Sequence, residues 1–474
     1  MRNLILAAAT AALALTTPLS AQSQQERLDA RYDRALAAGY KALMLCSAIA
    51  HAEANGTMRT PESVAQWELV GIQAPLDTII AELPFEIIRR PSGQIAHVAV
   101  TWADDMPARV AAYFGADTGC LALPTGTPEG WSDSRQFVPQ IVKLQSGSTM
   151  ELKVAQPSPA ATGIMREGEL ANVLAAAFGD AYGKGRTTAA LVNRFDADGS
   201  LVEGRERYAL GFDENTPQRT WSVAKSIAAT LIGAAAYRGE ADVNASAGLG
   251  PSDSDPRRAI TIDHLLRMTS GRYSDTPGNR TDPLYWGGAT VEEVALDWPL
   301  IAKPGSTYRY ANNDTLAAVA AIKPTFAAHP PAEFFTKLGM PHTVAETDWQ
   351  GNYILSSQVW TTALDLARLG QLYLNDGKLP SGERILPEGW VQYVSTPAGP
   401  QPDGPFGYGA GFWLMNASDG VPPDTFAAFG NRGQYVVIVP SRDVVIVRRG
   451  EDPVGARFDI AAFTRDVLAA LEDD

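Results

Sequence analysis

The spacing of apolar residues predicts a small N-terminal module with one long helix and a few strands. Apolar side chains recur every three or four positions from residue 26 to residue 55, as on one face of a helix that ends at Gly56. Short β-rich segments such as Ile95 to Trp102 follow, and then a stretch rich in Gly, Pro and Ser from Pro124 to Gly163. We expect residues 22–160 to form this module and a linker. These residues carry no recognisable motif. We expect that they cover one edge of the sheet in the larger domain.

From residue 165 to residue 474 the pattern predicts one larger domain. A helix from Glu167 to about Tyr182 precedes two strands, at residues 187–193 and 201–210, which the turn Asp196-Ala197-Asp198-Gly199 joins into a hairpin. Further helices are expected at residues 222–238, 261–268, 291–298, 362–375 and 456–471, and further strands at residues 407–415, 425–429, 434–439 and 444–448. If the separated strands join, the fold is α/β, of the α+β type: an antiparallel β-sheet flanked by helices, with an inserted helical subdomain.

The first 21 residues have the pattern of a secretory signal peptide. Arg2 precedes an apolar run from Leu4 to Leu15, and the small pair Ser20-Ala21 suggests cleavage before Gln22. This run is too short to span a bilayer, and a buried N-terminal helix is the alternative. We therefore expect residues 1–21 to be removed and the mature chain to be periplasmic or secreted.

Composition narrows the classes of function. The chain has 474 residues, of which 45% are hydrophobic, so it can bury large cores. Its 39 Lys and Arg against 53 Asp and Glu give a net charge of -14, which argues against nucleic-acid binding. After the leader, no uninterrupted apolar stretch approaches the roughly 18 residues that a membrane span needs, so we expect no such span.

Cysteine and histidine usage gives two further expectations. Cys46 and Cys120 are the only cysteines, and we expect them to form a disulfide in an oxidising compartment, with two buried free thiols as the alternative. The five histidines are scattered and show no metal-ligand spacing. We therefore expect neither a metal nor another cofactor.

The segment Ser222-Val223-Ala224-Lys225 is a candidate for nucleophilic catalysis. Positions three apart share a face of a helix, so the Ser222 hydroxyl and the Lys225 amine can touch. A lysine can take the proton of a serine if burial and nearby cations lower its pKa, and a helix N-terminus stabilises negative charge on an attacked carbonyl oxygen. The alternative is an ordinary N-cap serine with a surface lysine.

A second segment, Tyr310-Ala311-Asn312, follows a Pro-Gly turn at Pro304-Gly305. Such a tyrosine can relay a proton to a leaving group, and the Asn312 amide can hold the lysine or the substrate. The alternative is a core tyrosine beside a helix-capping asparagine. This segment matters because a Ser-x-x-Lys pair alone is weak evidence, whereas the two together are more specific.

With these two segments the sequence resembles the serine β-lactamase and penicillin-binding-protein superfamily, whose short sequence motifs we call boxes. Within it, the pattern is similar to the branch of class C β-lactamases, carboxylesterases and 6-aminohexanoate-dimer hydrolases. The resemblance covers about residues 165–470 and is carried by Trp221 to Ser226, Ile262 to Gly271, Tyr310 to Asn312, Thr362 to Lys378 and Gly433 to Pro440. It implies an acyl-enzyme mechanism with Ser222 as nucleophile, Lys225 as base and Tyr310 as proton relay.

The family's third box, a Lys or His followed by Thr or Ser and Gly, has no clear match. Alignment on Gly433-Gln434-Tyr435 places the box at Thr425-Phe426-Ala427, where no cation stands. The family's cation holds a substrate carboxylate, so its absence favours esters or amides over β-lactams. This alignment makes the Ala428 N–H the second oxyanion donor, opposite that of Ser222. A slipped alignment places Asn431-Arg432-Gly433 in the box, and Arg432 then supplies the charge.

Other residues have plainer interpretations. Asp263 and His264 are adjacent in a helical pattern, so they cannot face each other as in a triad, and we expect His264 to be structural. The chain has no Gly-x-Ser-x-Gly elbow, which argues against an α/β-hydrolase. The loop with Tyr273, Tyr285 and Trp286 either forms a wall of the substrate pocket or simply packs.

The sequence therefore predicts an exported serine hydrolase whose partner is a small-molecule ester or amide. A D-amino-acid peptidase or weak β-lactamase is the alternative enzyme. An alternative of another class is a penicillin-binding-like binding or sensor protein that is acylated without turnover. The presence of Ser222, Lys225 and Tyr310 together favours turnover, because binding alone does not require all three.

Overall fold

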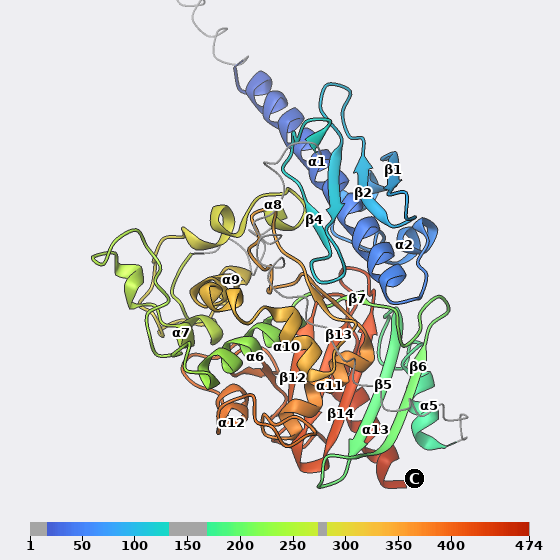
Figure 1. Ribbon diagram of the computed structural model, residues 1–474, viewed down its shortest axis with the longest axis vertical. Helices are drawn as coiled ribbons and strands as arrows, with labels where there is room; N and C mark the ends of the chain where they lie inside the picture. Colours follow the sequence, from blue (N-terminus) through green and yellow to red (C-terminus); the bar gives the residue numbers. More distant parts are fainter. Residues whose placement is uncertain (1–16, 132–167, 274–281, 474) are drawn as a thin grey trace, which may run out of the picture.

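A seven-stranded antiparallel sheet lies at the centre of the larger part of the chain (Figure 1). The computed structural model describes residues 17–131, 168–273 and 282–473. Across the sheet the strands follow the order β10 (Gly407–Tyr408), β11 (Trp413–Leu414), β12 (Phe426–Gly430), β13 (Gln434–Val439), β14 (Val444–Gly450), β5 (Thr187–Phe195) and β6 (Leu201–Tyr208). β5 and β6 form the predicted hairpin, and β14 pairs with β5. The strands before and after the helical region thus join in one sheet, as predicted.

Helices cover both faces of this sheet because its strands carry apolar residues on both sides. On β13, Val437 packs with the helices α5 (Glu169–Ala176) and α13 (Ile460–Asp473). Its neighbour Val436 packs on the other face, with α6 (Val223–Tyr237) and α11 (Ala363–Leu374). This alternation follows from the two-residue period of a strand. On this face α6 packs against β12.

The insertion between β6 and β10 is mostly helical, as predicted. It contains α6, α7 (Ile262–Leu266), α8 (Asp282–Tyr285), α9 (Asn312–Ala321), α10 (Pro331–Leu338), α11 and α12 (Trp390–Ser395), together with a small sheet in the order β7 (Gln218–Arg219), β9 (Val359–Thr361) and β8 (Val344–Ala345). The helix expected at residues 291–298 is a short π-helix, Glu292–Leu296. The strand expected at residues 407–415 is divided into β10 and β11, because the chain bends at Gly411 with φ +82°.

The N-terminal region forms its own small sheet with one long helix against it (Figure 1). The helix α1 (Thr17–Ala54) packs on a sheet in the order β1 (Phe85–Arg89), β2 (Ile95–Val100), β3 (Arg109–Tyr113) and β4 (Cys120–Ala122), with α2 (Pro61–Trp67) and α3 (Leu76–Ile80) beside it. α1 begins earlier than the predicted residue 26. Residues 1–16 of the predicted leader lie outside the described residues, and residues 17–21 are the first of α1.

One helix of the described ranges, Ser23–Ala54 within α1, has the length and composition to cross a membrane. Its most apolar window is entirely buried inside the protein, as in the core helix of a soluble protein. The apolar face of α1 is therefore explained by packing: Tyr40 contacts Trp286 edge to face at 5.3 Å, and Ile49 is 1% exposed.

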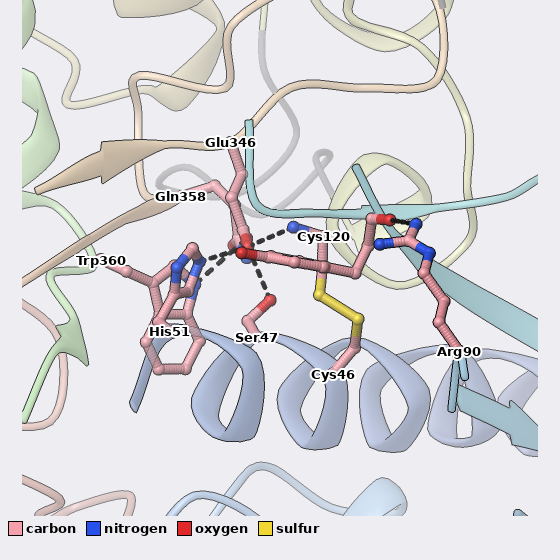
Figure 2. Close-up of a disulfide and its surroundings, with 9 residues drawn as sticks. Cys46, Ser47, His51, Arg90, Cys120, Glu346, Gln358 and Trp360 are labelled. Atoms are coloured by element: carbon pink, nitrogen blue, oxygen red, sulfur yellow. Dashed lines mark hydrogen bonds and ion pairs between the residues drawn. A yellow bond between two sulfur atoms is a disulfide. The ribbon is translucent and has the colours of Figure 1, made fainter. Parts of the chain in front are cut away.

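Figure 2 shows how the N-terminal region is joined to the rest of the chain. The predicted disulfide between Cys46 on α1 and Cys120 on β4 is present, with the two Cα atoms 6.1 Å apart. Beside it lies Glu346, which directly follows β8 and is fully buried. Its carboxylate accepts hydrogen bonds from Ser47, His51, the Cys120 N–H, Gln358 and Trp360, at distances of 2.7 to 3.1 Å. One carboxylate thus connects α1, β4 and β9.

The N-terminal region contacts the ends of strands and the helical insertion rather than an edge strand of the large sheet. Its core includes Trp221, Trp286 and Trp360 from the rest of the chain. The backbone carbonyls of Trp67 and Val70 accept hydrogen bonds from the turn between β12 and β13. The N-terminal region therefore packs against the segment that precedes α6, through Trp221.

Candidate active site

Ser222 and Lys225 are in contact at the start of α6. Ser222 immediately precedes the first helical residue and is half-buried, whereas Lys225 is only 1% exposed. The distance between Lys225 Nζ and Ser222 Oγ is 2.9 Å. The Ser222 side chain makes no capping hydrogen bond to the helix. An ordinary N-cap serine with a surface lysine is therefore the wrong interpretation of this pair.

Lys225 lies among uncharged oxygen atoms. Its Nζ is 2.5 Å from Asn312 Oδ1 and 3.0 Å from the Ser356 carbonyl oxygen. Burial lowers the pKa of Lys225 to about 7, because an ammonium ion loses hydration there. A neutral amine has two N–H groups for these acceptors and a lone pair that remains for the proton of the Ser222 hydroxyl. The amine is therefore placed to act as a base near neutral pH.

Tyr310 completes the group of residues around the Ser222 hydroxyl. It is half-buried on the extended segment before α9, and its side chain hydrogen-bonds to Ser222 and Trp413. Its ring centroid lies 4.8 Å from Lys225 Nζ. Burial raises the pKa of Tyr310 above its usual value, so the hydroxyl keeps its proton at neutral pH. A protonated phenol in this place can both accept a proton from one neighbour and donate its own to another.

Tyr285 belongs to the site through a residue that the sequence did not indicate. Its hydroxyl lies 2.6 Å from Ser356 Oγ, and the backbone carbonyl of Ser356 accepts from Lys225. The Arg219 guanidinium binds the neighbouring Ser357 through its carbonyl and its hydroxyl. Ser356 has no sequence signature because it acts through a backbone atom that every residue possesses. Tyr285 and its neighbour Trp286 are both buried in the core of the N-terminal region, so this part of the loop packs.

Tyr273 lies apart from this group. It lines a cavity of about 90 Å³ together with Met268, Arg309 and Ala311. Along an extended segment alternate residues point to opposite sides, so Arg309 and Ala311 face away from the side of Tyr310. The described contacts do not join Tyr273 to Ser222, and its role in substrate binding stays a prediction.

The backbone N–H of Ala428 is used inside the sheet. Across β11 and β12, the Met415 N–H donates to the Thr425 carbonyl. Successive residues of an antiparallel strand direct their backbone groups alternately to the two sides. Those of Ala428 consequently point to β13, where Ala428 pairs with Val436. The prediction that Ala428 supplies an oxyanion donor is therefore wrong.

Gly430 marks the part of β12 that lies closest to the nucleophile. A Cβ atom at Gly430 would be 2.3 Å from the carbonyl oxygen of Thr220, two residues before Ser222. Only glycine allows two backbones to approach this closely. The third box is therefore Ala428-Phe429-Gly430, followed by Asn431, and not either of the two predicted alignments. It contains no Lys, Arg or His.

Arg432 is committed to structural contacts away from the site. Its side chain is 2% exposed, and its Nε lies 2.7 Å from Glu451 Oε2. Its guanidinium also donates to the carbonyls of Trp67 and Val70 in the N-terminal region. Arg432 cannot hold a substrate carboxylate in this position, so its predicted binding role is wrong.

His264 is structural, as predicted. Its backbone N–H donates to the Thr261 hydroxyl and its Nδ1 accepts from the Thr261 N–H, so the pair caps α7 at its N-terminus. Within the described ranges, no cluster of three or more His, Cys, Asp or Glu side chains has the arrangement of a metal site.

A family model described as Beta-lactamase matches residues 199–470, more than half of the sequence. That range includes Ser222, Lys225, Tyr310 and the third box. No curated protein matches the sequence significantly.

Solved structures resemble the chain at low sequence identity. A proposed 6-aminohexanoate-dimer hydrolase from Bacillus anthracis is 24% identical, with a TM-score of 0.50 over 60% of this chain and 78% of the other. A proposed beta-lactamase from Bacteroides dorei DSM 17855 is 19% identical, with a TM-score of 0.50 over 61% of this chain and 95% of the other. These similarities concern the fold alone.

Proposed function

Because the chain belongs to the beta-lactamase family of serine hydrolases, we propose that it is an exported enzyme that cleaves ester or amide bonds through an acyl-enzyme on Ser222. The observation that carries this proposal is the distance of 2.9 Å between Ser222 Oγ and a buried Lys225 amine of pKa about 7. A serine hydroxyl is a weak nucleophile until such a base takes its proton.

In the first half of the reaction, Ser222 Oγ attacks the substrate carbonyl carbon while Lys225 accepts the hydroxyl proton. The new bond joins Oγ to that carbon, and the carbonyl oxygen becomes an oxyanion. The Ser222 N–H at the start of α6 is one donor for this oxyanion. We assign the second donor to the Asn431 N–H. Asn431 follows Gly430, which lies close to Thr220. The backbone groups of Ala428 and Gly430 point to β13, so the N–H of Asn431, the next residue, points to the other side.

The tetrahedral intermediate then loses its alcohol or amine. The bond between carbon and the leaving atom breaks, and Tyr310 gives its proton to that atom while Lys225 returns a proton to Tyr310. Water then attacks the carbonyl carbon of the resulting ester and gives up a proton through Tyr310 to Lys225. The bond between that carbon and Ser222 Oγ breaks, and Oγ takes a proton back from Lys225, which releases the acid and restores Ser222. Tyr310 suits this relay because it is hydrogen-bonded to Ser222 and lies against Lys225.

The third box supports esters and amides over β-lactams. A β-lactam carboxylate finds no Lys, Arg or His at Ala428-Phe429-Gly430, and Arg432 is bound to Glu451. The absence of one charge-assisted hydrogen bond costs about 1.5 to 3 kcal/mol, or roughly ten- to a hundredfold in rate. A D-amino-acid peptidase needs a similar cation for the terminal carboxylate of its peptide substrate, so this activity is the second candidate function.

Export rests on the leader pattern and on the disulfide. The pair Cys46–Cys120 is of the kind that persists in an oxidising compartment. Fractionation of the producing cells tests this part of the proposal: the protein is expected outside the cytoplasm with its N-terminus near Gln22. A full-length protein in the cytoplasm would contradict it.

The catalytic proposal is tested with a fluorophosphonate probe and two substrates. The probe is expected to label one serine, identified as Ser222 by peptide mass spectrometry, and Ser222→Ala should abolish labelling and turnover. Ser254→Ala, which changes an exposed serine of the helical insertion, serves as the control. The wild-type kcat/KM for p-nitrophenyl acetate should exceed that for nitrocefin by at least about tenfold. Labelling without ester turnover would instead support a sensor protein.

A further inference from the structure

Aromatic rings extend from Tyr310 onto two neighbouring strands of the large sheet, β11 and β12. The Tyr310 ring lies 5.3 Å from that of Trp413 on β11. Trp413 in turn stacks on Phe429 of β12, with centroids 5.8 Å apart and planes inclined by 17°. Trp413 pairs with Ala427, and Phe429 is two residues further along the same face, which explains the contact. Both rings are half-buried and so keep part of their surface accessible.

The strands β11 and β12 contribute no charged side chain to this surface. The strand β12 has only apolar residues, Phe426-Ala427-Ala428-Phe429-Gly430. The nearby cation Arg448, opposite Tyr435 on β14, is fully buried and is bound to Asp452 at 2.7 Å. A ligand group that contacts Trp413 and Phe429 therefore meets aromatic carbon rather than a free charge.

The position of this surface relative to Tyr310 identifies the part of the substrate that reaches it. Tyr310 is the proton donor to the leaving atom in the proposed reaction, so the leaving group must lie within hydrogen-bond distance of its hydroxyl. Trp413 hydrogen-bonds to Tyr310, and its indole N–H is its only donor. The leaving group consequently lies beside the Trp413 ring.

We propose that Trp413 and Phe429 form a leaving-group subsite that selects substrates whose alcohol or amine part is uncharged and apolar, with aromatic groups preferred. This inference rests on the proposed function and specifies its substrate class. Stacking on these rings favours a planar leaving group, and burial of an unpaired carboxylate against them is unfavourable.

The subsite acts on one half-reaction only. When the ester bond breaks, its oxygen departs with the leaving group and takes the proton from Tyr310, while the acyl group stays on Ser222. All acetate esters therefore give the same acetyl-enzyme, whatever their leaving group. A change at Phe429 should therefore alter the rate of acylation and leave the rate of hydrolysis of the acetyl-enzyme unchanged. A change at Trp413 also removes the hydrogen bond to Tyr310 and so affects both rates.

The test compares 4-acetoxybenzoate with its methyl ester, methyl 4-acetoxybenzoate. These acetates have the same ring and the same acyl group, and they differ in the charge of the leaving phenol. Each kcat/KM is divided by the rate of alkaline hydrolysis to correct for the leaving ability of the phenol. The wild-type protein should prefer the neutral ester by at least about tenfold.

Variants assign this preference to the two rings. Trp413→Ala and Phe429→Leu should each lower kcat/KM for the neutral ester by about three- to tenfold. Trp413→Phe keeps a ring but loses the N–H that bonds Tyr310, so it should retain the preference even if all rates fall. Tyr237→Ala, which changes an exposed ring at the far end of α6, is the matched control and should change nothing.

The outcomes separate the subsite from the proposed function. Equal corrected rates for the two acetates, or an unchanged preference in both Trp413→Ala and Phe429→Leu, would overturn the subsite while Ser222 labelling remains. Slower hydrolysis of the acetyl-enzyme in Phe429→Leu would also overturn it. Failure of the probe to label Ser222 in the wild-type protein would remove the proposed function and the subsite with it. Circular dichroism and thermal unfolding identify any variant that does not fold.

Discussion

At the scale of single residues, the structure prepares Ser222 through its neighbours. Trp221 has φ +51°, a left-handed conformation that costs a residue other than glycine about 1 to 2 kcal/mol. Its indole is held 3.8 Å from the Arg219 guanidinium, and it belongs to the core of the N-terminal region. This packing offsets the strain. It also fixes the turn from which the Ser222 side chain faces Lys225.

Lys225 determines the expected pH dependence. The pKa of this lysine is lowered from 10.5 to about 7, so the amine is protonated and inactive as a base below pH 7 and neutral above it. The rate of Ser222 acylation should therefore rise with pH to a plateau above about 7. Lys225→Arg should lower that rate by roughly a hundredfold or more, because an arginine stays protonated.

Asn312→Asp provides a variant that should shift this profile. A carboxylate in place of the amide that contacts Lys225 would stabilise the ammonium form and raise the pKa of Lys225. The rise in acylation rate should then move to higher pH by at least one unit, measured by stopped-flow labelling across a pH series. A rise at the same pH in both proteins would show that another group limits the reaction.

Sequence reasoning found the residues whose side chains act and missed those that act through the backbone. The spacing of Ser222 and Lys225, and the position of Asn312, follow from helix geometry and from recognisable side chains. Ser356 contributes a carbonyl oxygen, which leaves no trace in residue type. The third box was placed wrongly because the alignment counted back from Gly433-Gln434-Tyr435. The β12–β13 turn is only Asn431-Arg432-Gly433, so the residues of β12 lie closer to that anchor in the sequence than the alignment assumed.

At the scale of elements, Glu346 connects the N-terminal region to the segment around Ser356, whose carbonyl accepts a hydrogen bond from Lys225. It binds Ser47 and His51 on α1, and it binds Gln358, two residues after Ser356. Periodicity predicted α1 but not β4, β8 or β9, and it gave no sign of their contact through Glu346. The partners are separated by up to 299 residues, and a lone glutamate has no pattern that indicates burial.

Glu346→Ala should destabilise the protein severely. The substitution leaves buried donors from five groups without their acceptor, and we expect a loss of about 3 to 5 kcal/mol in the free energy of unfolding, measured with urea. Glu383→Ala, which removes an exposed partner of Lys337, should change it by less than about 0.5 kcal/mol. Similar effects of the two substitutions would refute this role of Glu346.

At the scale of the whole molecule, the N-terminal region is part of the enzyme's framework. Trp360 is fully buried, Trp221 is 9% exposed, and both pack in the core that α1 completes. The described part of this region supplies no side chain to the Ser222 and Lys225 contacts reported above. Its contribution is to bury the apolar surface behind them.

Deletion of residues 1–131 should therefore prevent folding of the remainder. We expect the shortened chain to be insoluble, or soluble without Ser222 labelling, because several large aromatic side chains lose their cover. A chain that begins at Gln22 is the control and should be labelled like the wild-type protein. Full labelling of the shortened chain would show that the hydrolase part folds alone.

The contacts of Arg432 have a consequence for the order of folding. Its guanidinium binds the carbonyls of Trp67 and Val70, which precede it by 365 and 362 residues. The ribosome therefore makes the first core of this protein long before it makes the residues that complete it. High contact order slows folding, and incomplete cores expose apolar surface in the meantime. Part of the apolar surface of the N-terminal region therefore stays uncovered during synthesis until Trp221, Trp286 and Trp360 have emerged.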